Sequence, residues 1–352
     1  MTGDPYDRLA EALHRLPNAF PRTKSNVEIS LLKKIFSSIE ADLASHLQGE
    51  MEPVDLIADR VNLSPDVVGK KLVNMAKSGL VWSGSYGGRP HFRLAPFMVG
   101  IYESQLDTMD EEFARLFEKY MAEGGAAGIM KPLPALHRVV PAKDSVRADW
   151  ILPYDDVRSI ILSAKQLRAR GCICRVQQDL LGQRKCDFPV NNCLMLAYAE
   201  RPVDPDDLTQ EQALSLLDET EDLGLVHTAS NVVHGISYIC NCCGCCCGIL
   251  RGITDWGVAN SVAHANYYAA VEPKKCTGCG TCGERCHVSA ISLDDDIASV
   301  DPDRCIGCGL CVTGCPGKAI RLERKREADI VHPPKDFGVW EQQRLRNRGV
   351  TS

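Results

Sequence analysis

The chain of 352 residues is long enough for two or three domains with a buried core, since one domain averages roughly 150 residues. Its 45% hydrophobic and 24% charged residues exclude a disordered or collagen-like chain. The net charge of −6 argues against nonspecific nucleic-acid binding by the whole chain. The longest uncharged apolar stretch, residues 94–102, is about half of a membrane span, and the N-terminus has no apolar signal segment. We therefore expect a cytoplasmic protein without a membrane span.

The N-terminal part predicts three helices. Residues 27–48 carry apolar side chains at three- and four-residue spacing, which is typical of one amphipathic helix. A short segment, 54–61, follows it. Residues 66–78 predict a further helix, with Ser64 as its N-cap and Gly79 as its end.

A hairpin is predicted over residues 80–94, with its tight turn at Gly87-Gly88. Helices followed by such a hairpin resemble a winged-helix domain over residues 25–98. The resemblance implies a recognition helix in a DNA major groove, with the wing tip at Arg89 and the basic residues Lys70, Lys71 and Lys77 on the helix. The alternative is a small domain for protein contacts or dimerisation, and dimerisation through it would make the protein a homo-oligomer. Residues 1–100 hold 12 Lys and Arg against 11 Asp and Glu, a balance that favours this alternative over DNA binding.

Further helices are predicted over residues 104–122 and 154–170 from their apolar periodicity. A Pro- and Gly-rich connector, 126–141, separates them and marks a domain boundary. A last helix is predicted over 209–223, where a Thr/Gln capping box opens it and a glycine closes it.

All 18 cysteines lie between Cys172 and Cys315, so the first 171 residues of the chain contain none. Without a secretion signal the compartment is expected to be reducing. Thiols that are this numerous are then metal ligands rather than disulfide partners. The sequence therefore places the chemistry in the C-terminal half.

The strongest motif is a cysteine run that occurs twice: Cys276-x2-Cys279-x2-Cys282-x3-Cys286, then Cys305-x2-Cys308-x2-Cys311-x3-Cys315-Pro316. Three closely spaced cysteines can wrap three corners of a cubane iron-sulfur cluster, and a remote fourth closes it. The small residues Gly278, Gly280, Gly307 and Gly309 would let backbone N–H groups approach the cluster. Zinc, the alternative metal, usually takes two CxxC units at a longer interval.

These runs, CTGCGTCGERCHVSAI and CIGCGLCVTGCPGKAI, closely resemble the bacterial-type two-cluster ferredoxins over residues 273–322. In that family the fourth cysteine of each run serves the other cluster. The resemblance thus implies a first [4Fe-4S] cluster on Cys276, Cys279, Cys282 and Cys315, and a second on Cys305, Cys308, Cys311 and Cys286. The sequence departs from the family where His287 replaces the usual proline, which changes the turn but removes no ligand.

The other ten cysteines fall into two groups: Cys172, Cys174, Cys186 and Cys193, then Cys240, Cys242, Cys243, Cys245, Cys246 and Cys247. Four thiolates suffice for one more cubane or one tetrahedral zinc. If the second group is extended, alternation directs Cys240, Cys242 and Cys246 to one face and Cys243, Cys245 and Cys247 to the other. Dense thiols without a metal would be prone to oxidation, so we predict one or two further iron-sulfur clusters here. Nearby polar residues are candidates for a ligand or proton relay or are ordinary hydrogen-bonding side chains: His227, Asn231, His234 and His264.

The predicted fold is α+β and multidomain. Residues 1–125 form a winged-helix-like domain with the helix that follows it, and 126–270 form a mostly helical, cysteine-rich middle region with an extra metal site. Residues 271–322 form the two-cluster ferredoxin domain. Residues 323–352 are a basic tail, expected to be a solvated extension.

These features favour a cytoplasmic electron-transfer protein of anaerobic or low-oxygen metabolism, which relays electrons between the middle site and a partner oxidoreductase. A dinucleotide fingerprint is absent, so a flavin or nicotinamide would lie on the partner. One alternative is a redox-sensing winged-helix regulator that binds DNA. Another is a reductase or activase whose middle cluster is itself catalytic.

Overall fold

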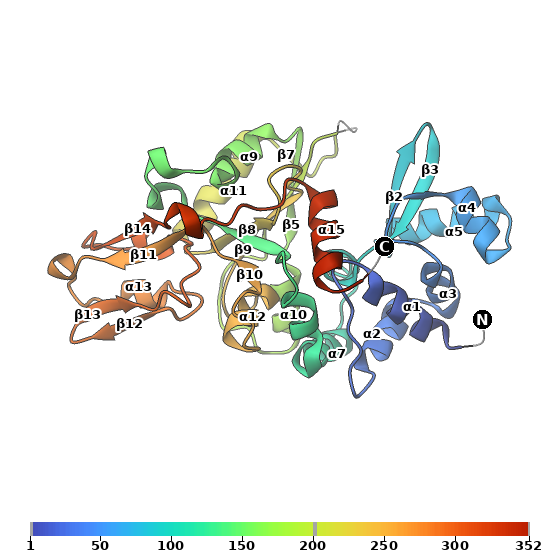
Figure 1. Cartoon of the computed structure of the whole chain (residues 1–352), viewed down its shortest axis with the longest axis horizontal. Coiled ribbons are helices and arrows are strands. Elements are labelled where there is room, and N and C mark those ends of the chain that lie inside the picture. The colour runs from blue at the N-terminus through green and yellow to red at the C-terminus, as the bar shows by residue number, and fades with distance from the viewer. Residues whose placement is uncertain (1–2, 200–202, 351–352) are drawn as a thin grey trace. The chain divides into compact units, whose positions relative to one another are not determined.

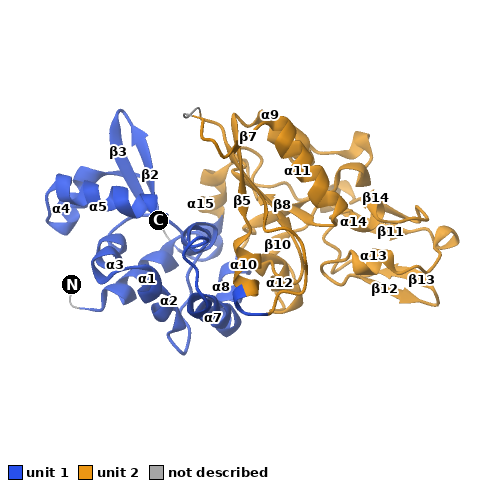
Figure 2. Ribbon diagram, turned by 180° about the vertical axis from the view of Figure 1, so that it is seen from behind, with its two compact units in different colours: residues 1–132, 180–182, 344–352 blue, residues 133–179, 183–343 orange. Residues whose placement is uncertain are grey.

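The computed structural model describes residues 3–199 and 203–350 (Figure 1). The chain forms two compact units, coloured separately in Figure 2. The first unit comprises residues 1–132, 180–182 and 344–352, and the second comprises 133–179 and 183–343. No helix in the described part of the chain is both long and apolar enough to cross a membrane.

The first unit begins with three helices, α1 (Pro5–Arg15), α2 (Val27–Ile35) and α3 (Ser38–Ser45). The prediction of one helix over 27–48 is wrong, because extended backbone at Phe36 ends α2 and Ser37 then caps α3. The Ser37 side chain accepts a hydrogen bond from Glu40 N, and the Glu40 carboxylate accepts one from Ser37 N. Helix α1 was not predicted, although Asp4 followed by Pro5 is a sequence signal for the start of a helix.

The next elements are β1 (Glu52–Pro53), α4 (Val54–Val61), α5 (Pro65–Lys77), β2 (Val81–Tyr86) and β3 (Arg89–Leu94). Both helices and the hairpin are therefore present as predicted. The strands form a sheet in the order β1-β3-β2. Gly87 and Gly88 make the hairpin turn with φ of 58° and 74°, which glycine adopts without strain. The resemblance of this part to a winged helix stays a prediction.

The helix predicted over 104–122 is shorter and interrupted. It consists of α6 (Tyr102–Ser104) and α7 (Glu111–Tyr120), and the second helix starts where the Asp110 side chain accepts from Phe113 N. The segment predicted as a connector also differs, since it contains α8 (Ala126–Met130) and the fully buried strand β4 (His137–Val140).

The second unit is built on a seven-stranded sheet in the order β10-β4-β8-β9-β6-β5-β7. Its pairs are antiparallel except β10 with β4. The strands after β4 are β5 (Gln166–Gly171), β6 (Asn191–Ala197), β7 (Asp207–Leu208), β8 (Val226–Ser230), β9 (Tyr238–Cys242) and β10 (Val262–Ala263). The helices are α9 (Val157–Ser163), α10 (Ile173–Leu180), α11 (Gln210–Asp222) and α12 (Gly248–Thr254).

The prediction of a mostly helical middle region is therefore wrong. The helix predicted over 154–170 ends at Ser163, and extended backbone at Ala164 leads into β5, which pairs with β6 and β7. These strand pairings are long-range, and they outweigh the local helical pattern. Helix α11 confirms its prediction, including the reciprocal capping box of Thr209 and Gln212.

The cysteine runs lie in a small α+β segment of the second unit. Its strands are β11 (Tyr267–Val271), β12 (Ile291–Asp294), β13 (Ile297–Val300) and β14 (Ile320–Arg324), and its helices are α13 (Thr281–Glu284) and α14 (Leu310–Thr313). β11 pairs with β14 and β12 with β13. The two runs thus have equivalent surroundings, and each contains a short helix that carries its third cysteine, Cys282 in α13 and Cys311 in α14.

The C-terminal tail is not the solvated extension that we predicted. It contains α15 (Phe337–Asn347), in which the Arg344 side chain is fully buried. The guanidinium donates to the carbonyl oxygen of Pro17 at 2.8 Å and to those of Ile129 and Pro132. The Arg344 side chain is therefore a buried hydrogen-bond donor to backbone carbonyl groups of the first unit. The basic composition of the tail does not reveal this role.

Candidate metal centres

Two cavities in the ferredoxin-like segment are lined by cysteine side chains. Cys276, Cys279, Cys282 and Cys315 line one of them. Cys286, Cys305, Cys308 and Cys311 line the other. Each cavity combines three cysteines of one run with the fourth of the other, the arrangement that the ferredoxin resemblance implies. Apolar side chains such as Ile306 and Ile320 complete the walls and exclude water.

Glycines shape the loops around both cavities. Gly278, Gly280, Gly307 and Gly309 all have φ between 68° and 80°, a region that favours glycine. A side chain at Gly307 would also meet the Tyr267 carbonyl oxygen at 2.4 Å. The loops can therefore wrap closely only because these positions lack a Cβ.

Backbone amides donate hydrogen bonds to several of the cysteine sulfurs. Ala290 N lies 3.1 Å from Cys286 Sγ, and Ala319 N lies 3.2 Å from Cys315 Sγ. Such donors stabilise negative charge on a thiolate, and they raise the reduction potential of a cluster that the thiolate holds.

The two cavities differ in their exposure to solvent. Cys279 in the first cavity is exposed, whereas all four cysteines of the second are buried or half-buried. Burial raises the pKa of the Cys308 thiol to about 12, so this ligand needs a metal ion to lose its proton near neutral pH. The Cys308 carbonyl accepts a hydrogen bond from Ala142 N at 2.9 Å, which fastens the second cavity to the loop after β4.

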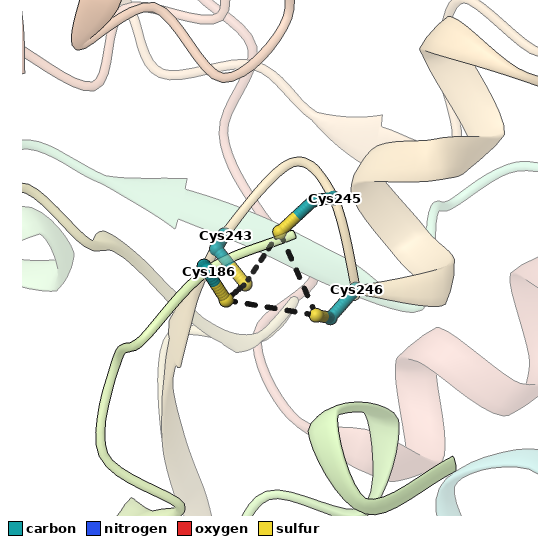
Figure 3. A group of neighbouring side chains, drawn as sticks. All are labelled: Cys186, Cys243, Cys245 and Cys246. Atoms are coloured by element: carbon teal, nitrogen blue, oxygen red, sulfur yellow. Dashed lines mark hydrogen bonds between the residues drawn. The ribbon is translucent and has the colours of Figure 1, made fainter. Parts of the chain in front are cut away.

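In the middle region, four cysteine sulfur atoms cluster together (Figure 3). Cys186 Sγ lies 3.8 Å from both Cys243 Sγ and Cys246 Sγ. Cys245 Sγ lies 3.7 Å from Cys243 Sγ and 3.6 Å from Cys246 Sγ. All four lie within 4.8 Å of one another. We call this set the tetrathiolate site.

The remaining six cysteines form a closed ring of neighbouring thiols. The Cys172 thiol neighbours those of Cys174 and Cys193. The Cys240 thiol neighbours those of Cys193 and Cys242. The ring closes at Cys247, whose thiol neighbours those of Cys174 and Cys242. We call this set, Cys172, Cys174, Cys193, Cys240, Cys242 and Cys247, the six-thiol ring.

The structure thus divides the ten cysteines differently from the sequence prediction. Cys186 was predicted with Cys172, Cys174 and Cys193 but belongs to the tetrathiolate site. It lies in the loop before β6, beside the turn that follows β9. The predicted alternation also fails at its end, where Cys246 and Cys247 exchange sides. The reason is that β9 ends at Cys242, and the chain then turns before Cys247 caps α12.

The buried Arg175 lies near cysteines of both the six-thiol ring and the tetrathiolate site. Its side chain is fully buried and donates to Asn192 Oδ1 at 2.8 Å and to the Asn241 carbonyl at 3.0 Å. Burial lowers the pKa of Arg175, but the charges of nearby thiolates, Cys172 first among them, outweigh it and raise the pKa overall. Its Nε has no hydrogen-bond partner among the residues that the structure describes. A buried cation beside these thiols fits a negatively charged centre. The cysteine spacing gave no indication of this residue.

His287, the departure from the ferredoxin pattern, contacts the tetrathiolate site. Its Nδ1 accepts a hydrogen bond from Gly244 N at 3.1 Å, and its Nε2 lies 2.7 Å from the Gly224 carbonyl oxygen. Its ring packs edge-on against Phe188 with the centroids 6.3 Å apart. This residue therefore links the ferredoxin-like segment to the turn that carries the tetrathiolate cysteines.

The polar residues near the cysteines take part in hydrogen bonds with other groups. His227 contacts Asn241 Oδ1 at 2.6 Å and Glu221 Oε2 at 3.4 Å. Asn231 donates to a backbone carbonyl, His264 contacts another, and the backbone N of His234 donates to the Lys335 carbonyl. None of them belongs to the tetrathiolate site, which cysteines alone make up.

Replacing Arg175 by Met is expected to lower the potential of any cluster held by the six-thiol ring. The substitution keeps the volume but removes a buried positive charge that favours the reduced state. A unit charge a few Å away, at an effective dielectric of about 20, is worth on the order of 100 mV for one electron. An EPR-monitored redox titration measures the shift, with the surface variant Arg158→Met as control. An unchanged midpoint would show that Arg175 does not face the cluster.

Comparison with known proteins agrees with the C-terminal geometry. Residues 269–322 match the family model of a 4Fe-4S dicluster domain. This part of the chain is a ferredoxin-like iron-sulfur domain, and the cysteine-rich middle region fits a further cluster. Neither the curated proteins nor the solved structures include a match to this chain.

Proposed function

We propose that the protein transfers electrons through two [4Fe-4S] clusters in the ferredoxin-like domain and a third cluster in the six-thiol ring. The observation that carries the proposal is the pair of cavities, each lined by four cysteines drawn from both runs. The bound clusters would supply one-electron chemistry. The chain supplies the thiolates, the apolar walls and the amide donors.

The six-thiol ring suits a cubane better than a single ion. In a cubane each thiolate ligates a different iron, so the sulfurs are spread apart. In the described part of the chain, the tetrathiolate site is the one group in which three or more ligand atoms lie so close together, so the ring sulfurs are more widely spaced. The buried Arg175 guanidinium adds a positive charge near Cys172 and Cys242 of the ring, which favours a negatively charged centre there.

The exposed and the buried cavity of the domain suggest the order of the clusters along the electron path. The first cavity opens to solvent at Cys279, where a partner oxidoreductase would exchange electrons. The second is fastened to the middle region through the hydrogen bond from Ala142 N to the Cys308 carbonyl. Electrons would pass between the ring and the partner through the second cluster and then the first. The partner would carry any flavin or nicotinamide.

A winged-helix role remains the second candidate, favoured by the order of α4, α5 and the hairpin. The near-neutral charge of residues 1–100 favours protein contacts over DNA for this part. A redox-dependent change in DNA affinity in a gel-shift assay would support the regulator instead.

Metal analysis of anaerobically purified protein tests the main proposal. Three clusters predict about twelve irons and about twelve sulfides per chain, whereas the ferredoxin-like domain alone predicts about eight. The variant Cys193→Ser removes a ring thiol and is expected to lose about four irons. Cys186→Ser, outside the ring, should lose none. About eight irons in the wild-type protein would reject the third cluster.

A further inference from the structure

The tetrathiolate site has the dimensions of a single-ion site. Zinc binds four cysteine sulfurs at about 2.3 Å in a tetrahedron, so neighbouring sulfurs are about 3.8 Å apart. Four sulfur–sulfur distances in the site, 3.6 to 3.8 Å, match that edge. Figure 3 shows the sulfurs of Cys186, Cys243, Cys245 and Cys246 directed toward one another around a common centre.

The ferredoxin-like domain provides an internal comparison. Its two sets of cysteines line cavities that suit cubanes, and neither set brings three sulfurs as close together as the tetrathiolate site does. The same chain thus contains wide and narrow four-cysteine sites. Four irons and four sulfides need the wide kind, because each thiolate lies at a separate corner.

We propose that Cys186, Cys243, Cys245 and Cys246 bind one zinc ion, separate from every iron-sulfur cluster of the protein. A tetrahedral four-sulfur site selects zinc or iron, and zinc binds such ligands more tightly than ferrous iron does. All four positions are filled by protein thiolates, so no position is open for water or substrate. This is the mark of a structural zinc site.

The site joins two segments that lie far apart in the sequence. Cys186 lies in a loop without regular secondary structure, and the other three ligands lie in the turn after β9. Arg184 supports the loop by donating to the Cys186 carbonyl oxygen at 2.7 Å. Gly244, between two of the ligands, donates to His287 at 3.1 Å. The zinc ion would therefore fix the turn whose Gly244 contacts His287 of the ferredoxin-like segment.

Two measurements on the wild-type protein test the proposal. Elemental analysis after anaerobic purification should find about one zinc per chain. X-ray absorption at the zinc edge should show four sulfur neighbours at about 2.3 Å and no metal neighbour. Zinc far below one per chain, a single iron in its place, or nitrogen or oxygen ligands would each overturn the assignment.

A matched pair of variants separates the zinc from the third cluster. Cys186→Ser should lose the zinc and keep all iron, whereas Cys193→Ser should keep the zinc and lose iron. Loss of iron from Cys186→Ser with no change in zinc would mean that a cubane occupies the tetrathiolate site. If Cys186→Ser does not fold, Cys245→Ser gives the same comparison at a half-buried position. Because the zinc is counted apart from iron, this result is independent of the electron-transfer proposal.

Discussion

Cys308→Ala is expected to destroy or convert the second ferredoxin cluster. The side chain lines the cavity together with Cys286, Cys305 and Cys311, and its loss leaves one iron corner without a thiolate. Iron content should fall by up to about four per chain, with loss of the corresponding EPR signal in the reduced protein. The electron path from the middle region to the exposed first cavity would then be interrupted.

Two comparisons make the result specific. The first unit contains no cysteine, so its thermal unfolding within the full chain should be unchanged. Cys279→Ala removes an exposed ligand of the first cavity and should leave the second cluster intact. Unaltered iron content and EPR in Cys308→Ala would contradict the ligand set.

The ferredoxin-like geometry could be predicted because its ligands are close in sequence. Three of the four cysteines of each cavity lie within seven residues, and short loops with glycines of positive φ fix their positions. The resemblance supplied the exchange of the fourth cysteine. Only the local spacing and the family pattern were needed for this part of the site.

The middle region could not be predicted in the same way. Its sheet pairs β5 with β6 and β8 with β9, and helical periodicity over 154–170 concealed the first of these strands. Cys186 joins cysteines more than fifty residues away, which spacing cannot indicate. The buried Arg344 shows the same limit, since its partners are carbonyl oxygens that no sequence pattern marks.

His287 lies where the ferredoxin pattern has proline, and the structure explains the departure. A neutral imidazole supplies one acceptor, used by Gly244 N, and one donor, directed at the Gly224 carbonyl oxygen. Burial lowers the pKa of His287, which favours this neutral form. The backbones are also close, since a Cβ on Gly244 would lie 2.3 Å from the His287 carbonyl oxygen. The domain is thus joined to the tetrathiolate turn by two hydrogen bonds of His287 and by a close backbone approach at Gly244.

His287→Pro is therefore expected to separate the two parts while sparing the ferredoxin clusters. It removes two buried hydrogen bonds, at about 1 kcal/mol each, so the Gly244 amide should exchange with solvent about thirtyfold faster. Hydrogen exchange of the peptide that spans 243–247, read by mass spectrometry, measures this. His287→Gln retains a donor and an acceptor and should stay near the wild-type rate. Because no ligand changes, iron content should remain constant in both variants. Loss of iron in His287→Pro, or equal exchange in all three proteins, would show that His287 serves the cluster rather than the junction.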